Sequence, residues 1–334
     1  MKEALYYQKL ENQKVLCLLC PHHCIISPNK RGFCGVRENI EGVLYTLIYG
    51  KTSSIALDPI EKKPLYHFYP GSSILSLGTV GCNFKCPFCQ NWSISQVFPE
   101  EIPLEKIEKE TLVNLALKNN SIGISYTYNE PFIWYEFVLE VSKFAKNYGL
   151  KNVLVTNGYV EEEPFLEIAP YIDAMNIDIK SIKEDFYNKL CKGSLKNVQR
   201  IIELAYSKGI HIELTNLIIT GYNDKKEEIL ELIEYVASID PNIPLHFTRY
   251  FPAYNFTNPP TSLEILKFAY KEAQKKLNFV YIGNIWDPES STTYCPSCKK
   301  ELIIREGYHI RKNLLKVSNI CPYCGFKISN YVGG

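Results

Sequence analysis

The sequence has no long run of apolar residues and no marked excess of charge of either sign. No stretch of about 18 or more apolar residues occurs, so we expect no transmembrane helix. The net charge is +1 and no run of one sign reaches six residues, which gives no general attraction to nucleic acid or to an anionic membrane. Internal repeats and low-complexity segments are also absent. These absences argue against a membrane protein, a repeat protein and a general nucleic-acid binder.

The first residues, MKEALYYQKLENQK, lack the basic segment followed by an apolar segment that marks a secretory signal. The composition is that of a globular protein, with 46% apolar and 22% charged residues, which is enough apolar side chain for a sizeable core. We therefore expect a cytoplasmic protein of one large domain or a few modules.

Cysteine, in contrast, is abundant, and its twelve residues are grouped along the chain. Close C-x2-C and C-x3-C pairs in a chain without a secretory signal are typical of metal sites in a reducing cytoplasm rather than of disulfides. Only Cys191 stands apart. The other eleven form three groups, which are Cys17, Cys20, Cys24 and Cys34; Cys82, Cys86 and Cys89; and Cys295, Cys298, Cys321 and Cys324.

The central group has the spacing C-x3-C-x2-C, formed by Cys82, Cys86 and Cys89. Thiolates select iron–sulfur clusters and zinc, and three of them can bind three irons of a 4Fe-4S cluster. The fourth iron then has no protein ligand, which suggests chemistry at that iron rather than simple electron storage. The alternative is a zinc knuckle that lacks its fourth ligand.

The two outer groups predict further metal sites. The N-terminal group, with His22 and His23 inside it, offers four thiolates, or three and a histidine. We favour zinc there because a structural metal suits a loop-rich segment, with a second iron–sulfur cluster as the alternative. The C-terminal group, C-x2-C-x22-C-x2-C, is typical of a zinc ribbon or a rubredoxin-like site. Zinc would be structural there, whereas iron would make it an electron relay.

Three segments differ in pattern. Residues 1–70 are expected to form the N-terminal cysteine module and residues 291–334 the C-terminal one. Residues 71–290 alternate short apolar strands with amphipathic segments, which predicts parallel strands joined by right-handed crossovers, in a doubly wound sheet or a barrel. The expected strands are 74–80, 123–126, 152–156, 174–179, 211–219, 245–249 and 279–282, and the expected helices are 104–118, 132–148, 161–168, 195–207, 226–239 and 262–277.

Polar residues stand where these strands end. The carboxyl ends of parallel strands gather at one rim, where α/β barrels place their active sites, so we expect these residues to share a site. Asp178 and Lys180 point the same way on one strand. Each residue taken singly has an ordinary alternative role, such as Asn129 as a helix cap.

The segment Val80–Trp92 resembles the cluster loop of the radical S-adenosylmethionine (SAM) enzymes, whose pattern is C-x3-C-x-aromatic-C; Phe88 fills the aromatic position. The resemblance implies an α/β fold, a partial (β/α)6 barrel, with a small Cys-rich N-terminal module and a C-terminal zinc-ribbon-like module. It also implies that SAM caps the fourth iron. The family's Gly-Gly-Glu tripeptide is replaced by Tyr128-Asn129-Glu130, so only Glu130 matches it.

The stretch Asp58–Gly71, together with the cluster loop and the N-terminal cysteines, resembles one subfamily, the radical SAM enzyme of the AmmeMemoRadiSam system, which is similar to pyruvate formate-lyase activating enzymes. Lys63 and His67 are candidates to reach the mouth of the cluster site. The resemblance implies that the SAM site comprises Cys82, Cys86, Cys89, Phe88, Asn129, Glu130, Thr156, Asn157, Asp178, Lys180, Asn216, Gly283 and Asn284.

The resemblance implies an enzyme that reductively cleaves SAM at a 4Fe-4S cluster. The resulting 5′-deoxyadenosyl radical would abstract hydrogen from a substrate, with a protein glycine as one candidate and another macromolecule or a metabolite as others. An electron donor of the ferredoxin or flavodoxin type is then expected, and no residue beyond the cofactor contacts is assigned to catalysis. The alternatives are a non-catalytic electron-transfer protein with several metal sites and a zinc-ribbon nucleic-acid binder.

Overall fold

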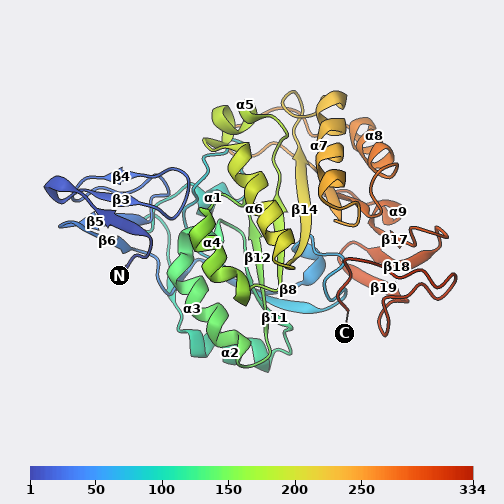
Figure 1. Ribbon diagram of the computed structural model, residues 1–334, viewed down its shortest axis with the longest axis horizontal. Helices are drawn as coiled ribbons and strands as arrows, with labels where there is room; N and C mark the ends of the chain where they lie inside the picture. Colours follow the sequence, from blue (N-terminus) through green and yellow to red (C-terminus); the bar gives the residue numbers. More distant parts are fainter. Residues whose placement is uncertain (334) are drawn as a thin grey trace.

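The computed structural model describes residues 1–333 and divides into a central α/β body with a smaller module at each end of its long axis (Figure 1). The N-terminal module is blue in Figure 1 and the C-terminal module is red. Among residues 1–333 no helix has the length and apolar character needed to cross a membrane.

The central body is built on one eight-stranded sheet, in the order β16-β15-β14-β13-β12-β11-β9-β8. Seven neighbouring strands are parallel, and β8 pairs with β9 in the antiparallel direction at one edge. The two edge strands do not pair with each other, so the sheet is an incomplete barrel. The strands are β8 Ser54–Pro59, β9 Ser73–Gly78, β11 Gly123–Tyr126, β12 Lys151–Thr156, β13 Ala174–Asp178, β14 His211–Ile218, β15 Leu245–Arg249 and β16 Val280–Gly283.

Long helices cover the outer face of this sheet, as Figure 1 shows for α3, α4, α6 and α7. In α6 the buried residues Val198, Ile201 and Ile202 recur at helical spacing and face the core. The longer helices are α2 Lys109–Lys118, α3 Tyr135–Lys146, α4 Glu162–Ile168, α6 Leu195–Ser207, α7 Lys226–Ile239 and α8 Leu263–Ala273; short turns are α1 Trp92–Ser95, α5 Glu184–Phe186 and α9 Pro288–Ser291.

The observed elements agree with the predicted strand–helix alternation, and the α/β fold with its partial barrel is confirmed. The predicted strand 123–126 and the predicted strand 245–249 are reproduced at both ends. One strand of the sheet was not predicted: β8 lies before residue 70, inside the stretch assigned to the N-terminal module. The pairing of β8 with β9 therefore extends the central sheet into that stretch.

The N-terminal module consists of small antiparallel sheets. One has the order β1-β6-β5 and the other β2-β3-β4, and a two-stranded pair, β7 Lys51–Thr52 with β10 Glu105–Lys106, joins the module to the body. The strands of the two sheets are β1 Lys2–Glu3, β2 Tyr7–Lys9, β3 Val15–Cys17, β4 Ile25–Ile26, β5 Arg37–Ile40 and β6 Val43–Thr46.

The C-terminal module is a three-stranded antiparallel sheet, β17 Thr293–Tyr294, β18 Glu301–Glu306 and β19 His309–Asn313. Arg305 anchors this sheet to the body, because its buried guanidinium donates to the carbonyl of Tyr66 at 2.6 Å and to the carbonyl of Ser291 at 3.1 Å. The segment after β8 and the C-terminal module therefore hold each other in place.

A buried ion pair joins the N-terminal module to the body. Arg37 of β5 contacts Glu136 of α3, and both side chains are 1% exposed. Arg37 also donates to the carbonyl of Leu5 at 2.9 Å, and the Leu5 amide donates to Glu136 at 2.8 Å. Removing one partner would leave an uncompensated buried charge. This destabilises a protein far more than replacing both partners with apolar residues.

We expect Glu136→Ala to lower the free energy of unfolding by about 3–5 kcal/mol, because Arg37 would stay buried without its carboxylate. The matched control is Glu231→Ala, which removes an exposed ion pair with Lys183 and should cost about 1 kcal/mol or less. Denaturant unfolding measures both. Equal effects of the two substitutions would contradict the role given to the buried pair.

Candidate functional site

A cavity of about 920 Å³ opens at the carboxyl ends of the parallel strands. Its wall includes Cys82, Cys86 and Cys89, which stand in the loop between β9 and α1. The parallel register forces this convergence, because each strand that ends in a polar residue delivers it to the same rim. The prediction that the strand-end residues share a site is therefore supported by their positions.

Packing at Gly81 and hydrogen bonds from Asn129 fix the conformation of the cluster loop. Gly81 has a φ of +86°, and a Cβ at that position would lie 2.8 Å from the carbonyl oxygen of Cys34, so only glycine fits there. Asn129 braces the same turn, because its side-chain oxygen accepts from the Thr79 amide at 3.0 Å and its amide nitrogen donates to the Gly81 carbonyl at 2.9 Å. Asn129 lines the cavity, but its side-chain amide is committed to the loop.

Backbone and side-chain groups point hydrogen-bond donors at the sulfur atoms. The Phe84 amide lies 3.3 Å from the sulfur of Cys82, and the side-chain amide of Asn157 lies 3.7 Å from it. The hydroxyl of Ser95 lies 3.1 Å from the sulfur of Cys89. Within residues 1–333 these three sulfurs do not gather within 4.8 Å of one another, as the ligands of a single ion would. Three thiols spaced around one cavity fit a multi-iron cluster.

Glu130 is a buried carboxylate at the cavity wall. It accepts hydrogen bonds from the Phe132 amide at 3.0 Å, the Thr156 hydroxyl at 2.7 Å and the Asn157 amide at 2.8 Å. Burial raises the pKa of Glu130 to about 7 despite these bonds. Ionising a buried carboxyl costs free energy. An ammonium group next to Glu130 would therefore strongly stabilise its ionised form.

Asp178 and Lys180 form an ion pair of 2.7 Å at the end of β13, and both line the cavity. The two side chains point the same way, as their spacing on a strand predicts. Tyr187 fixes the position of Lys180, because its hydroxyl accepts from the Lys180 amide at 2.9 Å. The pair presents one acidic and one basic group to the same space.

Most of the other predicted contacts also lie at the wall. Thr156, Asn157, Gly283, Asn284 and Phe88 all line the cavity. At Gly283 a side chain would not fit without a shift, since a Cβ would lie 2.8 Å from the methyl carbon of Thr248.

Two predicted residues lie elsewhere. Asn216 is absent from the cavity wall, because strand residues alternate and its neighbours Thr215 and Leu217 take the inward positions. Its amide instead donates to the Ile179 carbonyl at 2.8 Å. His67 does not reach the cluster mouth either; it is buried, and its Nε2 lies 2.7 Å from the hydroxyl of Tyr281.

Lys63, a candidate from the sequence, lies at the cavity wall, whereas Tyr128 and several other residues of the wall were not assigned from the sequence. Lys63 and Tyr128 form one side of the cavity, and both contact Asp58 of β8, Lys63 at a distance of 2.6 Å. Burial lowers the pKa of Lys63 to about 8. Tyr128 has a φ of 71°, an uncommon conformation for a residue other than glycine. The remaining unassigned residues include Asn176, Thr215, His246 and Thr248.

A buried carboxylate supports the floor of the site. Glu213 of β14 accepts hydrogen bonds from the His67 amide at 2.7 Å and the Tyr66 amide at 3.0 Å, and it lies 2.7 Å from the Nε2 of His246. Because His246 lines the cavity, this carboxylate connects the segment after β8 to the wall of the site.

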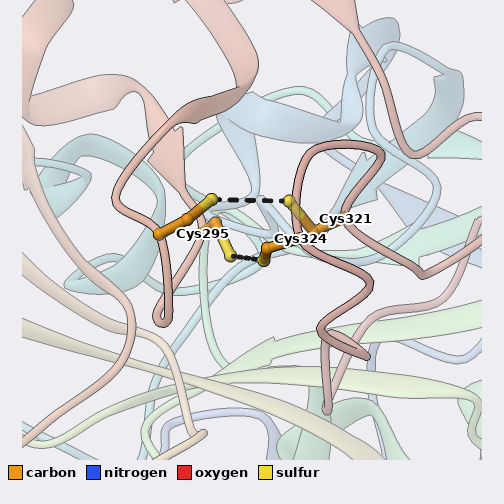
Figure 2. A group of neighbouring side chains, drawn as sticks. Cys295, Cys321 and Cys324 are labelled. Atoms are coloured by element: carbon orange, nitrogen blue, oxygen red, sulfur yellow. Dashed lines mark hydrogen bonds between the residues drawn. The ribbon is translucent and has the colours of Figure 1, made fainter.

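The C-terminal cysteines form a compact group. Cys295 and Cys324 have sulfurs 3.6 Å apart, Cys298 and Cys321 have sulfurs 3.7 Å apart, and all four lie within 4.8 Å of one another. Figure 2 shows Cys321 and Cys324 on one loop facing Cys295 on another. Four thiolates around a tetrahedral ion with bonds of about 2.3 Å would stand about 3.8 Å apart, so the group fits one zinc or iron ion.

Comparison with known proteins places this site in a family. A family model described as the radical SAM superfamily matches residues 76–236. An uncharacterized protein of Methanocaldococcus jannaschii is 48% identical over 332 residues, which cover 98% of this chain and 99% of that protein. The 7-carboxy-7-deazaguanine synthase of the same organism is 29% identical over 45% of this chain and 68% of its own length. The pyruvate formate-lyase-activating enzyme of Clostridium pasteurianum is 23% identical over 59% of this chain and 85% of its own length.

The chain contains a domain of the radical SAM superfamily over residues 76–236. It is therefore an enzyme, and the non-catalytic alternatives lose their support. The superfamily implies a 4Fe-4S cluster and SAM, and the three thiols and the Glu130 carboxylate at one cavity fit that pair of cofactors.

We expect Cys298→Ala to remove the ion from the C-terminal module, because three thiolates no longer complete a tetrahedral site. Elemental analysis of the purified protein should show the loss of one metal ion per chain, and limited proteolysis should cut within residues 291–333. Ser297→Ala changes the exposed neighbour and should keep the metal. Unchanged metal content in Cys298→Ala would refute this assignment.

Proposed function

We propose that the enzyme binds SAM in the large cavity, with Cys82, Cys86 and Cys89 holding the cluster that cleaves it. The observation that carries this proposal is the placement of these thiols, Glu130 and the Asp178–Lys180 pair on the wall of one cavity. When bound, the reduced cluster supplies the electron that releases a 5′-deoxyadenosyl radical from SAM.

The side chains of the wall suit the different parts of SAM. Glu130 can accept hydrogen bonds from the amino group, since charge-assisted bonds of this kind are strong. Lys180 can bind the carboxylate and Asp178 the ribose hydroxyls, while Gly283, which has no side chain, lets the flat adenine approach the backbone of the cavity wall. The buried wall excludes water from the reacting atoms.

The substrate would occupy the side of the cavity formed by Lys63 and Tyr128. Both side chains are polar and line the same cavity as the three cysteines, and neither has a role in the SAM binding proposed above. The cavity rim also carries two large exposed aromatic side chains, Trp286 at 78% and Tyr308 at 46% exposure. Exposed aromatic residues at a rim favour a substrate that extends beyond the cavity, such as a segment of a protein. We therefore propose hydrogen abstraction from a macromolecule, in the manner of an activating enzyme.

An electron donor must reduce the cluster before each turnover. A ferredoxin or flavodoxin type of carrier in the cytoplasm would suit the one-electron step. The net charge of +1 gives no support to nucleic acid as the substrate.

We expect Cys86→Ala to abolish the formation of 5′-deoxyadenosine from SAM and dithionite, because two thiolates cannot hold the cluster. Anaerobic incubation followed by chromatography measures the product. Ser93→Ala, an exposed change in α1 just behind the loop, serves as the control and should keep full activity. Failure of the fully reconstituted wild type to form 5′-deoxyadenosine would reject the proposed function.

We expect SAM to bind more weakly as the pH falls below about 7. The ammonium group binds the ionised form of Glu130, whose pKa burial raises to about 7, so the affinity should fall about tenfold per pH unit below that value. Asp178 and the Cys82 thiol both interact electrostatically with this carboxyl, and Asp178 adds to the rise in its pKa. Equilibrium binding across about pH 5.5–7.5 tests this, and Glu130→Gln should bind weakly with no such dependence. A steep fall that persists in Glu130→Gln would assign the titration to another group.

A further inference from the structure

The four N-terminal cysteines enclose a second, smaller cavity, separate from the SAM site. Cys17 comes from β3, and Cys20, Cys24 and Cys34 come from the loops around it. The space between the sulfurs is apolar, and its walls come from both the module and the body, where Phe132 and Ile133 take part. Neither histidine of the group belongs to the wall.

The two histidines have other partners. The Nε2 of His22 lies 2.7 Å from the Asn83 carbonyl, and the Nε2 of His23 lies 2.9 Å from Glu161. The ligand set is therefore four thiolates, not three and a histidine. Two donors already point at these sulfurs, the Phe33 amide at 3.4 Å from Cys24 and the buried guanidinium of Arg37 at 3.7 Å from Cys17.

The spacing of the sulfurs separates the three cysteine groups into two kinds. The C-terminal four gather within 4.8 Å, as one tetrahedral ion requires. In the described part of the chain, no three of the N-terminal sulfurs gather that closely, and neither do Cys82, Cys86 and Cys89. Thiolates of a 4Fe-4S cluster stand further apart than those of one ion, because four irons and four sulfides lie between them. The N-terminal group is thus, like Cys82, Cys86 and Cys89, more open than one tetrahedral ion requires.

We propose that Cys17, Cys20, Cys24 and Cys34 hold a second 4Fe-4S cluster, and that this cluster passes an electron to the one on Cys82, Cys86 and Cys89. The first part rests on the cavity and the spacing alone. The second part rests on the proposed cleavage of SAM. The buried Arg37 beside Cys17 would offset the negative charge that four thiolates bring into an apolar cavity.

The loop that carries Cys82 also borders the N-terminal cysteine cavity. Gly81, which precedes Cys82, packs against the carbonyl of Cys34, where a Cβ would lie at 2.8 Å. Asn83, which follows Cys82, lines the N-terminal cavity and accepts a hydrogen bond from Asn157 at 2.9 Å. The loop that holds one site therefore forms part of the wall of the other.

A row of aromatic rings also runs between the two sites. The ring of His22 lies 4.1 Å from Phe33 and 5.2 Å from Tyr159, and Tyr159 lies 4.9 Å from Phe84 in the cluster loop, measured between ring centres. Covalent and packed contacts therefore connect the N-terminal site to the loop without an intervening solvent gap.

The electron balance of this step is simple. An external one-electron carrier of low potential loses one electron, and the N-terminal cluster goes from the 2+ to the 1+ state. It returns to 2+ when the second cluster takes up that electron. No bond is formed or broken, and no proton is required.

Counting acid-labile sulfide tests the first part, because sulfide belongs only to clusters and not to a mononuclear ion. We expect about eight sulfides per chain in the anaerobically reconstituted wild type, and about four in the Cys82/Cys86/Cys89→Ala variant with an electron paramagnetic resonance signal after reduction. About four sulfides in the wild type together with two zinc ions per chain would overturn the proposal. This count does not depend on whether SAM is cleaved.

A comparison of two reductants tests the second part. We expect Cys17/Cys20/Cys24/Cys34→Ala to form 5′-deoxyadenosine with dithionite at a rate close to that of the wild type, but at least about tenfold more slowly with a reduced ferredoxin. Equal activity with both reductants would reject the relay. Loss with both, in a variant that retains about four sulfides per chain, would assign the N-terminal site a structural role and also reject it. Failure of the proposed function would appear differently, as no 5′-deoxyadenosine from the wild type.

Discussion

The parallel alignment of the sheet is the constraint on which the rest of the site depends. Seven neighbouring strands run the same way, so the residues that end them must meet at one rim whatever their separation in sequence. The cluster loop, Glu130 and the Asp178–Lys180 pair come from three different strand ends and line one cavity because of this register. The helices cover the outer face of the sheet, while the residues at the rim remain available to form the site.

Buried charges connect the two outer modules to this body. Arg37 pairs with Glu136 on the N-terminal side, and Arg305 binds the Tyr66 carbonyl on the C-terminal side. Each charge is out of water and so depends on its partners, which fixes the position of the module that carries it. The cysteine groups of the two modules differ accordingly: the C-terminal group is compact and suits one ion, while the N-terminal group is wider and lies directly behind the cluster loop.

The sequence predicted the alternation of strands and helices, the three cysteine groups and most of the rim, because spacing and periodicity are local signals. Strand β8 was not predicted, because its residues do not alternate clearly between apolar and polar. Its place in the sheet comes from its pairing with β9. Asn216 was assigned to the site through the family resemblance, but alternation along β14 turns it away. Tyr128 meets Lys63 and Asp58 across segments that are far apart in the sequence, with Asp58 and Tyr128 70 residues apart, and no local pattern shows such a contact. The width of the N-terminal cysteine group is likewise a property of the fold.

The most direct test of the account is Mössbauer spectroscopy of the ⁵⁷Fe-loaded protein before and after SAM is added. An iron with no protein ligand should change its spectrum when SAM binds, while the other irons keep theirs. The account predicts that one iron per chain responds, that it belongs to the cluster on Cys82, Cys86 and Cys89, and that the response is lost in the Cys82/Cys86/Cys89→Ala variant. A spectrum unchanged by saturating SAM would contradict the account.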